Sequence, residues 1–198
     1  NRIHNKWLGQ LVFVDDGSTD DTSEKLKSYK IESFKHVENR GKGAAIQTAM
    51  ACIVKNKGEH VVIIDIDLQH PPELIDYFSD ISEETILLGY RNNRRNMPLT
   101  RQLSNFITSL LISIRTCAVI KDSQCGYRSF QTKIFNKIQF AEQGFQFESE
   151  FLIKAVLAGW KVQHVPIPTI YGNESSAMRN VKDTIKFINM WLKSYFWT

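Results

Sequence analysis

Two carboxylates separated by one residue are the first feature of this sequence that points to chemistry. Asp65 and Asp67 follow the apolar stretch 60–64, and Gln69 continues the same spacing. In an extended chain, side chains at positions i and i+2 point the same way. Paired oxygen ligands suit a hard divalent ion that also holds a diphosphate. The same residue types are typical of a turn before a helix that starts with proline, so the pair alone leaves both interpretations open.

Two more groups of polar residues follow apolar stretches. Asp15 and Asp16 come after the stretch 10–14, and Arg91 comes after the stretch 85–88. Ligands of open α/β sheets bind outside the carboxyl ends of the strands. We therefore expect these residues to share one edge of a sheet with the two carboxylates described above.

The elements that must position these residues alternate between strands and helices. The patterns predict strands at 10–14, 34–37, 60–64, 85–88 and 161–165, and helices at 44–54, 71–80, 99–118 and 147–157. Such alternation predicts an α/β fold, with helices on both faces of a sheet. The stretch 60–64 is rich in β-branched residues, and we expect it to be a central parallel strand with both faces buried.

Length and composition favour a single folded domain. A chain of 198 residues suits one domain over 1–198, in which 171–198 would form a C-terminal loop and an amphipathic helix. With 42% hydrophobic and 23% charged residues, collagen-like, coiled-coil and disordered classes fit poorly. The net charge of +4 is too small to predict a nucleic-acid partner.

The cysteines and the hydropathy pattern bear on location. The three cysteines contain no Cys-x-x-Cys pair, which favours a reducing compartment over a disulfide framework or a zinc site. No apolar run of about 18 residues and no basic leader are present, so we expect neither a membrane span nor a signal peptide. The segment 187–198 is amphipathic and aromatic, typical either of a membrane interface or of docking on the protein's own core. We expect a cytoplasmic protein, with peripheral contact at the inner face of the membrane.

Five short segments of the sequence, taken in their order along the chain, form a recognisable set of motifs. They are 14–20 (VDDGSTD), 39–45 (NRGKGAA), 61–73 (VVIIDIDLQHPPE), 122–128 (DSQCGYR) and 147–150 (FESE). The set resembles family 2 glycosyltransferases, in the branch that contains dolichol-phosphate mannose synthase, and the resemblance extends from Leu11 to about Lys193. It implies a GT-A nucleotide-sugar-binding fold, with a mixed and mostly parallel central sheet.

The resemblance also implies the residues of the donor site. The donor, a UDP- or GDP-linked sugar, would contact Asp15, Asp16, Gly41, Lys42 and Asp65. A divalent ion, Mg²⁺ or Mn²⁺, would be bound by Asp65, Asp67 and Gln69, and Asp67 would act in catalysis.

On the acceptor side, the resembled branch commonly uses a lipid phosphate. Arg91, Arg101, Gln124 and Arg179 would bind the acceptor, and Asp122 would be the catalytic or acceptor-orienting carboxylate. A phosphate acceptor is already an anion, so it needs positioning more than a strong base. The resemblance therefore implies a metal-dependent, inverting transfer to a polyprenyl phosphate.

Two departures from the family pattern keep alternatives open. The family begins with a strand that ends in a Pro-x-Tyr-Asn-Glu type motif, which nothing before Leu11 supplies. We therefore expect the chain to start late, with part of the nucleotide site outside this sequence. Mannose synthases place a serine four residues after the arginine that corresponds to Arg101, where this chain has Asn105.

Three other functions remain as alternatives at this stage. They are transfer to a polysaccharide or another sugar hydroxyl, non-catalytic binding of a nucleotide sugar, and an aspartyl-nucleophile phosphatase. The phosphatase fits less well, because Leu68 to His70 stands where such enzymes need a small or hydroxyl residue. The sugar, the nucleobase and the oligomeric state stay open.

Overall fold

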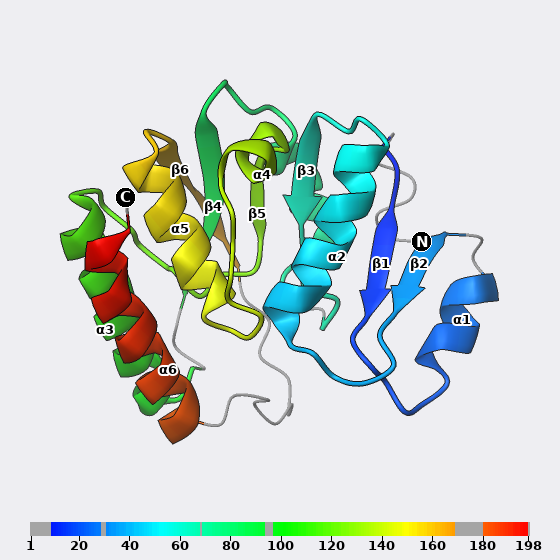
Figure 1. Cartoon of the computed structure of the whole chain (residues 1–198), viewed down its shortest axis with the longest axis horizontal. Helices are drawn as coiled ribbons and strands as arrows, with labels where there is room; N and C mark the ends of the chain where they lie inside the picture. The colour runs from blue at the N-terminus through cyan, green and yellow to red at the C-terminus, as the bar shows by residue number, and fades with distance from the viewer. Residues whose placement is uncertain (1–8, 29–30, 68, 94–96, 169–179, 198) are drawn as a thin grey trace.

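The computed structural model describes residues 9–28, 31–67, 69–93, 97–168 and 180–197. The strands are β1 (Val12–Asp15), β2 (Glu32–Lys35), β3 (His60–Ile63), β4 (Thr85–Arg91), β5 (Arg128–Gln131) and β6 (Lys161–Ile167). The α-helices are α1 (Thr22–Ser28), α2 (Lys42–Lys55), α3 (Leu99–Thr116), α4 (Lys133–Lys137), α5 (Phe147–Leu157) and α6 (Asn180–Lys193). Two 3₁₀ helices are η1 (Pro72–Phe78) and η2 (Ser194–Phe196). Figure 1 shows their arrangement.

The described strands form two sheets. β1 and β2 pair in parallel, and a second sheet has the order β3-β5-β4-β6. In the second sheet β5 runs antiparallel to both β3 and β4, whereas β4 and β6 are parallel. Strands and helices alternate along most of the chain, as the sequence predicts, and the sheet is mixed, as the resemblance implies. It is not mostly parallel, because two of the three pairings in the four-stranded sheet are antiparallel.

The predicted position of the strand at 60–64 is wrong. β3 lies at the end of its sheet in the described residues, pairs antiparallel with β5, and has only Val61 fully buried. The physical reason is β5, which the sequence does not reveal because it begins with Arg128 and Ser129. That short strand inserts between β3 and β4 and reverses the direction of pairing.

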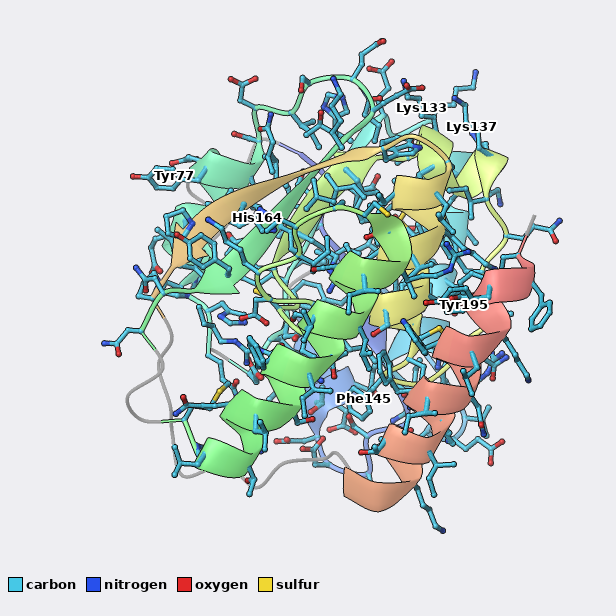
Figure 2. The ribbon with its side chains drawn as sticks, turned by 90° about the vertical axis from the view of Figure 1, so that its left-hand side faces the viewer. Tyr77, Lys133, Lys137, Phe145, His164 and Tyr195 are labelled. Carbon is cyan, nitrogen blue, oxygen red and sulfur yellow. The ribbon has the colours of Figure 1, made fainter. Side chains whose placement is uncertain are left out.

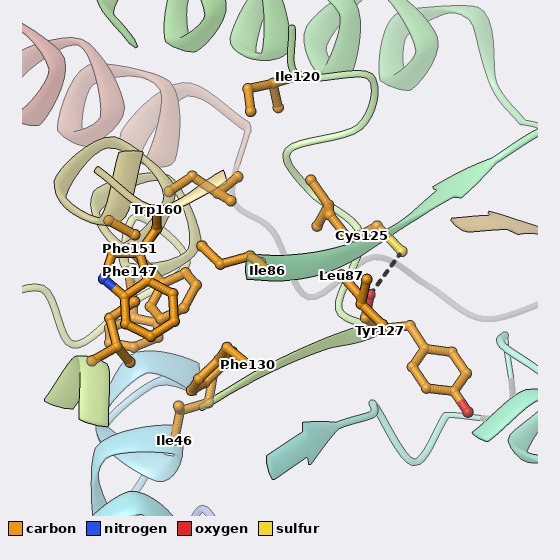
Figure 3. Close-up of a cluster of buried hydrophobic side chains, with 14 of the residues drawn as sticks. Ile46, Ile86, Leu87, Ile120, Cys125, Tyr127, Phe130, Phe147, Phe151 and Trp160 are labelled. Carbon is orange, nitrogen blue, oxygen red and sulfur yellow. Dashed lines mark hydrogen bonds between the residues drawn. The ribbon is translucent and has the colours of Figure 1, made fainter. Parts of the chain in front are cut away.

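The core is rich in aromatic rings. Phe130 of β5 and Phe151 of α5 lie with their ring centroids 4.6 Å apart, and Phe135, Phe140 and Phe147 complete the cluster. Figure 3 shows Phe130, Phe147 and Phe151 in the buried cluster that also contains Ile86 and Leu87 of β4. Each large apolar side chain that is fully buried contributes about 1.5 to 3 kcal/mol. This packing fixes the N-terminal turn of α5 against the sheet.

Two helices stack beside α5, at the left of Figure 1. α6 contacts α3 through the indole Nε1 of Trp191, which donates to the carbonyl of Leu111 at 2.9 Å. Arg115 of α3 donates to the carbonyl of Ser194 at 2.6 Å and lies over the ring of Tyr195. Within the described residues, none of the helices is long and apolar enough to cross a membrane.

Candidate active site

A chain of ion pairs begins at the first carboxylate after β3. The Nζ atom of Lys42, in the first turn of α2, lies 2.7 Å from Asp65 Oδ2 and 2.8 Å from Glu148 Oε1. Arg128 of β5 lies 3.4 Å from the same oxygen of Glu148. Burial would raise the pKa of Asp65, but the Lys42 ammonium group outweighs burial and lowers it. Burial would likewise lower the pKa of Lys42, and the two carboxylates instead raise it.

A glycine allows the segment 122–128 to approach Asp65. A Cβ atom on Gly126 would stand 2.1 Å from Asp65 Oδ2, far inside van der Waals contact. Only glycine fits there without moving the carboxylate. The backbone of segment 122–128, which contains the predicted acceptor residues Asp122 and Gln124, therefore borders Asp65, the carboxylate predicted to bind the donor.

Asp16 joins two loops that the sequence assigns to the nucleotide. Its carboxylate accepts hydrogen bonds from the backbone N–H groups of Arg40 at 2.9 Å and Gly41 at 2.7 Å. It also lies 2.6 Å from Nδ1 of His36. Burial would raise the pKa of Asp16, but these donors outweigh it and lower the pKa. Gly41 adopts φ of 99° beside the carbonyl of Gln143, a conformation that favours glycine.

Asp15 turns its carboxylate into its own loop. It accepts a hydrogen bond from the backbone N–H of Ser18 at 2.8 Å and another from the hydroxyl of Ser23. Hydrogen bonds from these two serines lower the pKa of Asp15 to about 2. The contact of Asp15 with the nucleotide stays a prediction, whereas its hydrogen bonds to Ser18 and Ser23 hold the turn between β1 and α1.

The second cluster lies where β4 ends. Asp122 is fully buried and accepts two hydrogen bonds from the guanidinium group of Arg91, at 2.7 and 2.8 Å. The backbone N–H of Arg91 donates to the same carboxylate, and so does the side-chain amide of Asn105 at 2.8 Å. Burial would raise the pKa of Asp122, but the hydrogen bonds and charge of Arg91 lower it. Asp122 is therefore ionised and a weak base in this arrangement.

His70 lies between the two clusters. The imidazole is buried, with Nε2 3.9 Å from the Cys125 sulfur, and Nδ1 has no hydrogen-bond partner in the described part of the chain. Burial lowers the pKa of His70, and the positive charge of Arg91 lowers it further. Burial raises the pKa of the Cys125 thiol to about 12, so the thiol stays protonated near neutral pH and is a packed residue rather than a nucleophile.

The remaining predicted site residues are less closely tied to these clusters. Asp67 is exposed and accepts the backbone N–H of Gln69 at 3.0 Å. Arg101 is half-buried in the first turn of α3, and the amide of Gln124 lies 3.5 Å from the Thr108 hydroxyl. Among the described residues, no group of three or more His, Cys, Asp and Glu side chains is arranged to hold a metal. Arg179 lies outside the described residues.

Three residues of these clusters were not predicted as site residues. Glu148 and Arg128 belong to motifs that the sequence shows, but only the folded chain brings them to Lys42. Asn105 stands where the mannose synthases have a serine. A polar side chain on the buried side of a helix was the sequence feature that could have identified it as a site residue. Of the three groups expected at one sheet edge, those after β3 and β4 lie in one sheet, where the segment 122–128 joins the two clusters. Asp15 and Asp16 instead follow β1, which belongs to the other described sheet.

Comparison with known proteins identifies the family. Residues 9–142 match the model of glycosyl transferase family 2. The chain belongs to glycosyl transferase family 2. This glycosyltransferase is 32% identical to an uncharacterized protein of Methanocaldococcus jannaschii, over 81% of this chain and 70% of that protein. It is 28% identical to UDP-N-acetylglucosamine–dolichyl-phosphate N-acetylglucosaminyltransferase of Methanococcus voltae, over 89% of this chain and 81% of the relative.

Solved structures confirm the GT-A fold. The glycosyltransferase aligns with glucosyl-3-phosphoglycerate synthase from Mycobacterium tuberculosis, solved in complex with UDP, with a TM-score of 0.73. The match covers 93% of this chain and 68% of the other, at 17% identity. Another structure of that synthase holds Mn²⁺ and UDP-glucose. At this identity the likeness establishes the fold alone.

Proposed function

We propose that this glycosyltransferase moves a sugar from a nucleoside diphosphate sugar to a polyprenyl phosphate, with inversion at the anomeric carbon. An oxygen of the acceptor phosphate attacks the anomeric carbon from the face opposite the leaving group. The bond from that carbon to the donor's diphosphate breaks, and the nucleoside diphosphate leaves. A relative from Methanococcus voltae is named for transfer to dolichyl phosphate, which supports this acceptor class.

The paired state of Asp122 is the observation that carries the acceptor proposal. A sugar hydroxyl must lose its proton during transfer and needs a general base with a suitable pKa. Asp122 is bound by Arg91 and Asn105 and has a lowered pKa, so it is poorly suited to that task. A phosphate acceptor is already deprotonated near neutral pH. In that reaction Asp122 orients Arg91, and Arg91 attracts the acceptor phosphate.

A divalent metal fits the residues that follow β3. Asp65 and Asp67 supply hard carboxylate oxygens, which suit Mg²⁺ or Mn²⁺, and Gln69 adds an amide oxygen. Two carboxylates do not fill the coordination sphere of a divalent ion, so the oxygens of a donor diphosphate could complete it. A bound ion would offset the negative charge of the leaving nucleotide. Lys42 stands against Asp65 and supplies a fixed positive charge on the same side.

The test is a screen of donors and acceptors with the purified protein. Labelled UDP- and GDP-sugars are incubated with a short polyprenyl phosphate in detergent, with and without Mg²⁺ or Mn²⁺, and label is counted in the organic phase. We expect metal-dependent transfer with one donor class. Asp67→Asn should reduce transfer at least about 100-fold, because it removes one metal carboxylate.

The matched control is Asp80→Asn, an exposed carboxylate that precedes β4 and lies outside both clusters. Near-normal transfer by Asp67→Asn would contradict the metal role. If label is transferred to a sugar hydroxyl and not to polyprenyl phosphate, the proposed acceptor class is wrong. Donor binding without turnover in any acceptor would favour the binding-module alternative.

A further inference from the structure

Lys42 places a positive charge against the first carboxylate after β3. Its Nζ atom lies 2.7 Å from Asp65 Oδ2 and 2.8 Å from Glu148 Oε1. Burial would lower the pKa of Lys42, but the two carboxylates outweigh burial and raise it, so the side chain is a cation at neutral pH. A monovalent cation therefore stands beside a carboxylate that the proposed divalent ion must also bind.

Glu148 anchors the ammonium group of Lys42 from the side of α5. The first turn of α2 lies close to the start of α5, as Figure 1 shows, and a Cβ atom on Gly43 would stand 2.6 Å from the Cβ atom of Phe147. This close approach brings Lys42 to Glu148, whose side chain is 6% exposed. The positive charge is thus held in place even when Asp65 binds another cation.

The charges around Asp65 are nearly balanced without a divalent ion. Lys42 pairs with both Asp65 and Glu148. Arg128 lies 3.4 Å from Glu148, so the two carboxylates are matched by two cations. Asp67 adds one negative charge, whereas a divalent ion brings two positive charges. The ion alone would therefore leave this group of side chains with a positive net charge, which the anionic oxygens of a diphosphate can neutralise.

We propose that Lys42 competes with the divalent ion for Asp65, so that the ion binds tightly only together with the diphosphate of a nucleotide. Glu148 keeps the ammonium group beside the ion, and the diphosphate neutralises both positive charges. A cation within about 4 Å weakens the binding of a proton to a carboxylate about 10- to 1000-fold, and a doubly charged ion meets at least the same repulsion. The inference rests on the metal ion and the donor of the proposed function.

Lys42 thereby couples the binding of two ligands. The repulsion between Lys42 and the ion is relieved when the diphosphate binds, so each ligand binds more tightly in the presence of the other. The same coupling acts at the end of a turnover. Once the nucleoside diphosphate leaves, the charge of Lys42 weakens the hold of Asp65 on the ion, and the ion pair seen in the structure forms again.

The test measures binding of Mn²⁺ and needs no sugar transfer. The purified protein is dialysed to equilibrium against Mn²⁺, with or without UDP or GDP on both sides, and the excess of Mn²⁺ on the protein side is measured. We expect one nucleotide to tighten Mn²⁺ binding at least about tenfold. Lys42→Met should bind Mn²⁺ alone at least about tenfold more tightly than the unchanged protein, because the competing charge is gone. The tightening by the nucleotide should shrink by a similar factor.

Two further variants complete the test. Lys42→Gln removes the charge but keeps an amide that can donate to Glu148, so it should show the same gain in Mn²⁺ affinity even if the methionine variant fails to fold. The matched control is Lys137→Gln, which removes an exposed lysine of α4 at the periphery of the molecule in Figure 2 and should bind Mn²⁺ like the unchanged protein.

The outcomes separate this inference from the proposed function. If the neutral variants at Lys42 bind Mn²⁺ alone no more tightly than the unchanged protein, the inference is overturned and the metal role stands. An equal gain in Lys137→Gln also overturns it, because the effect would then come from net charge. If the unchanged protein binds no Mn²⁺ with either nucleotide, the inference and the proposed metal role are both wrong.

Discussion

Gly126 is the residue on which the geometry around Asp65 depends most directly. Gly126→Ala would place a methyl group 2.1 Å from the present position of Asp65 Oδ2, so the carboxylate must leave the position in which it pairs with Lys42. We expect a loss of at least about 100-fold in transfer, because a displaced charge near the reacting groups costs several kcal/mol. The measurement is turnover, together with the thermal stabilisation that the nucleotide and Mn²⁺ give.

A matched glycine provides the control for that variant. At Gly144 an added methyl group meets only the end of the Gln146 side chain, which can rotate away. Gly144→Ala should therefore retain most turnover and most nucleotide stabilisation. Equal behaviour of the two variants would show that the close approach of Gly126 to Asp65 has no role in activity.

The hydrogen bonds of Asp15 predict a pH-dependent contribution to stability. Its pKa is about 2 in the folded chain, whereas the carboxyl has a pKa of 3.8 without the hydrogen bonds of the fold. Folding therefore favours the ionised form of Asp15. The contribution is complete above pH 3.8 and is lost as the pH falls toward 2. Asp15→Ala should lower the free energy of unfolding by about 1 to 2 kcal/mol at neutral pH. In urea titrations that difference should shrink by about half at pH 3, and a constant difference would contradict this role.

At the scale of elements, α3 depends on hydrogen bonds from its polar inner side. The hydroxyl of Ser109 accepts the backbone N–H of Ser123 at 2.9 Å in a buried position. Ser109→Ala would leave that N–H unpaired and should lower the free energy of unfolding by about 1 to 3 kcal/mol. The exposed Ser104→Ala on the same helix is the control, expected within about 0.5 kcal/mol. Urea denaturation, followed by two spectroscopic probes, gives the free energy of unfolding of each variant. Equal free energies for Ser109→Ala and Ser104→Ala would contradict this role of Ser109.

The elements also show what a sequence can and cannot reveal. The helix 147–157 was predicted with its observed bounds, because a dense apolar run ends at Gly159. β5 was missed, because a four-residue strand that begins with Arg128 lacks an apolar alternation. Its insertion also explains why the predicted direction of pairing at β3 was wrong. Local patterns determine which segments become regular, whereas the order of strands depends on contacts between distant segments.

The candidate site divides in a similar way. Spacing drew attention to Asp65 and Asp67, and the order of the motifs then favoured a site for them and for Asp122 and Lys42. The partner of Lys42 on α5, Glu148, lies 106 residues away in the sequence and could be identified only after folding. The sequence analysis placed Arg91 and Asp122 on the acceptor side but could not predict that they form an ion pair.

At the scale of the whole molecule, Lys42 connects α2, the end of β3 and α5. Lys42→Met would leave Asp65 and Glu148 close together without their common cation. We expect a loss of about 2 to 4 kcal/mol in the free energy of unfolding, less than for a fully buried pair because Asp65 retains solvent contact. Lys137→Met removes an exposed pair with Glu84 and should cost less than about 1 kcal/mol. Chemical denaturation distinguishes them, and similar costs for the two variants would contradict the structural role of Lys42.

The most direct test of the central claim compares two acceptors that differ only in the phosphate. Phytanyl phosphate and phytanol are offered to the protein with the donor found in the screen, and the products are identified by mass spectrometry. The account predicts a sugar phosphodiester from phytanyl phosphate and no glycoside from phytanol, because Asp122 is held ionised by Arg91 and is a weak base. Comparable transfer to the phytanol hydroxyl would contradict the claim that this site acts on an acceptor that is already an anion.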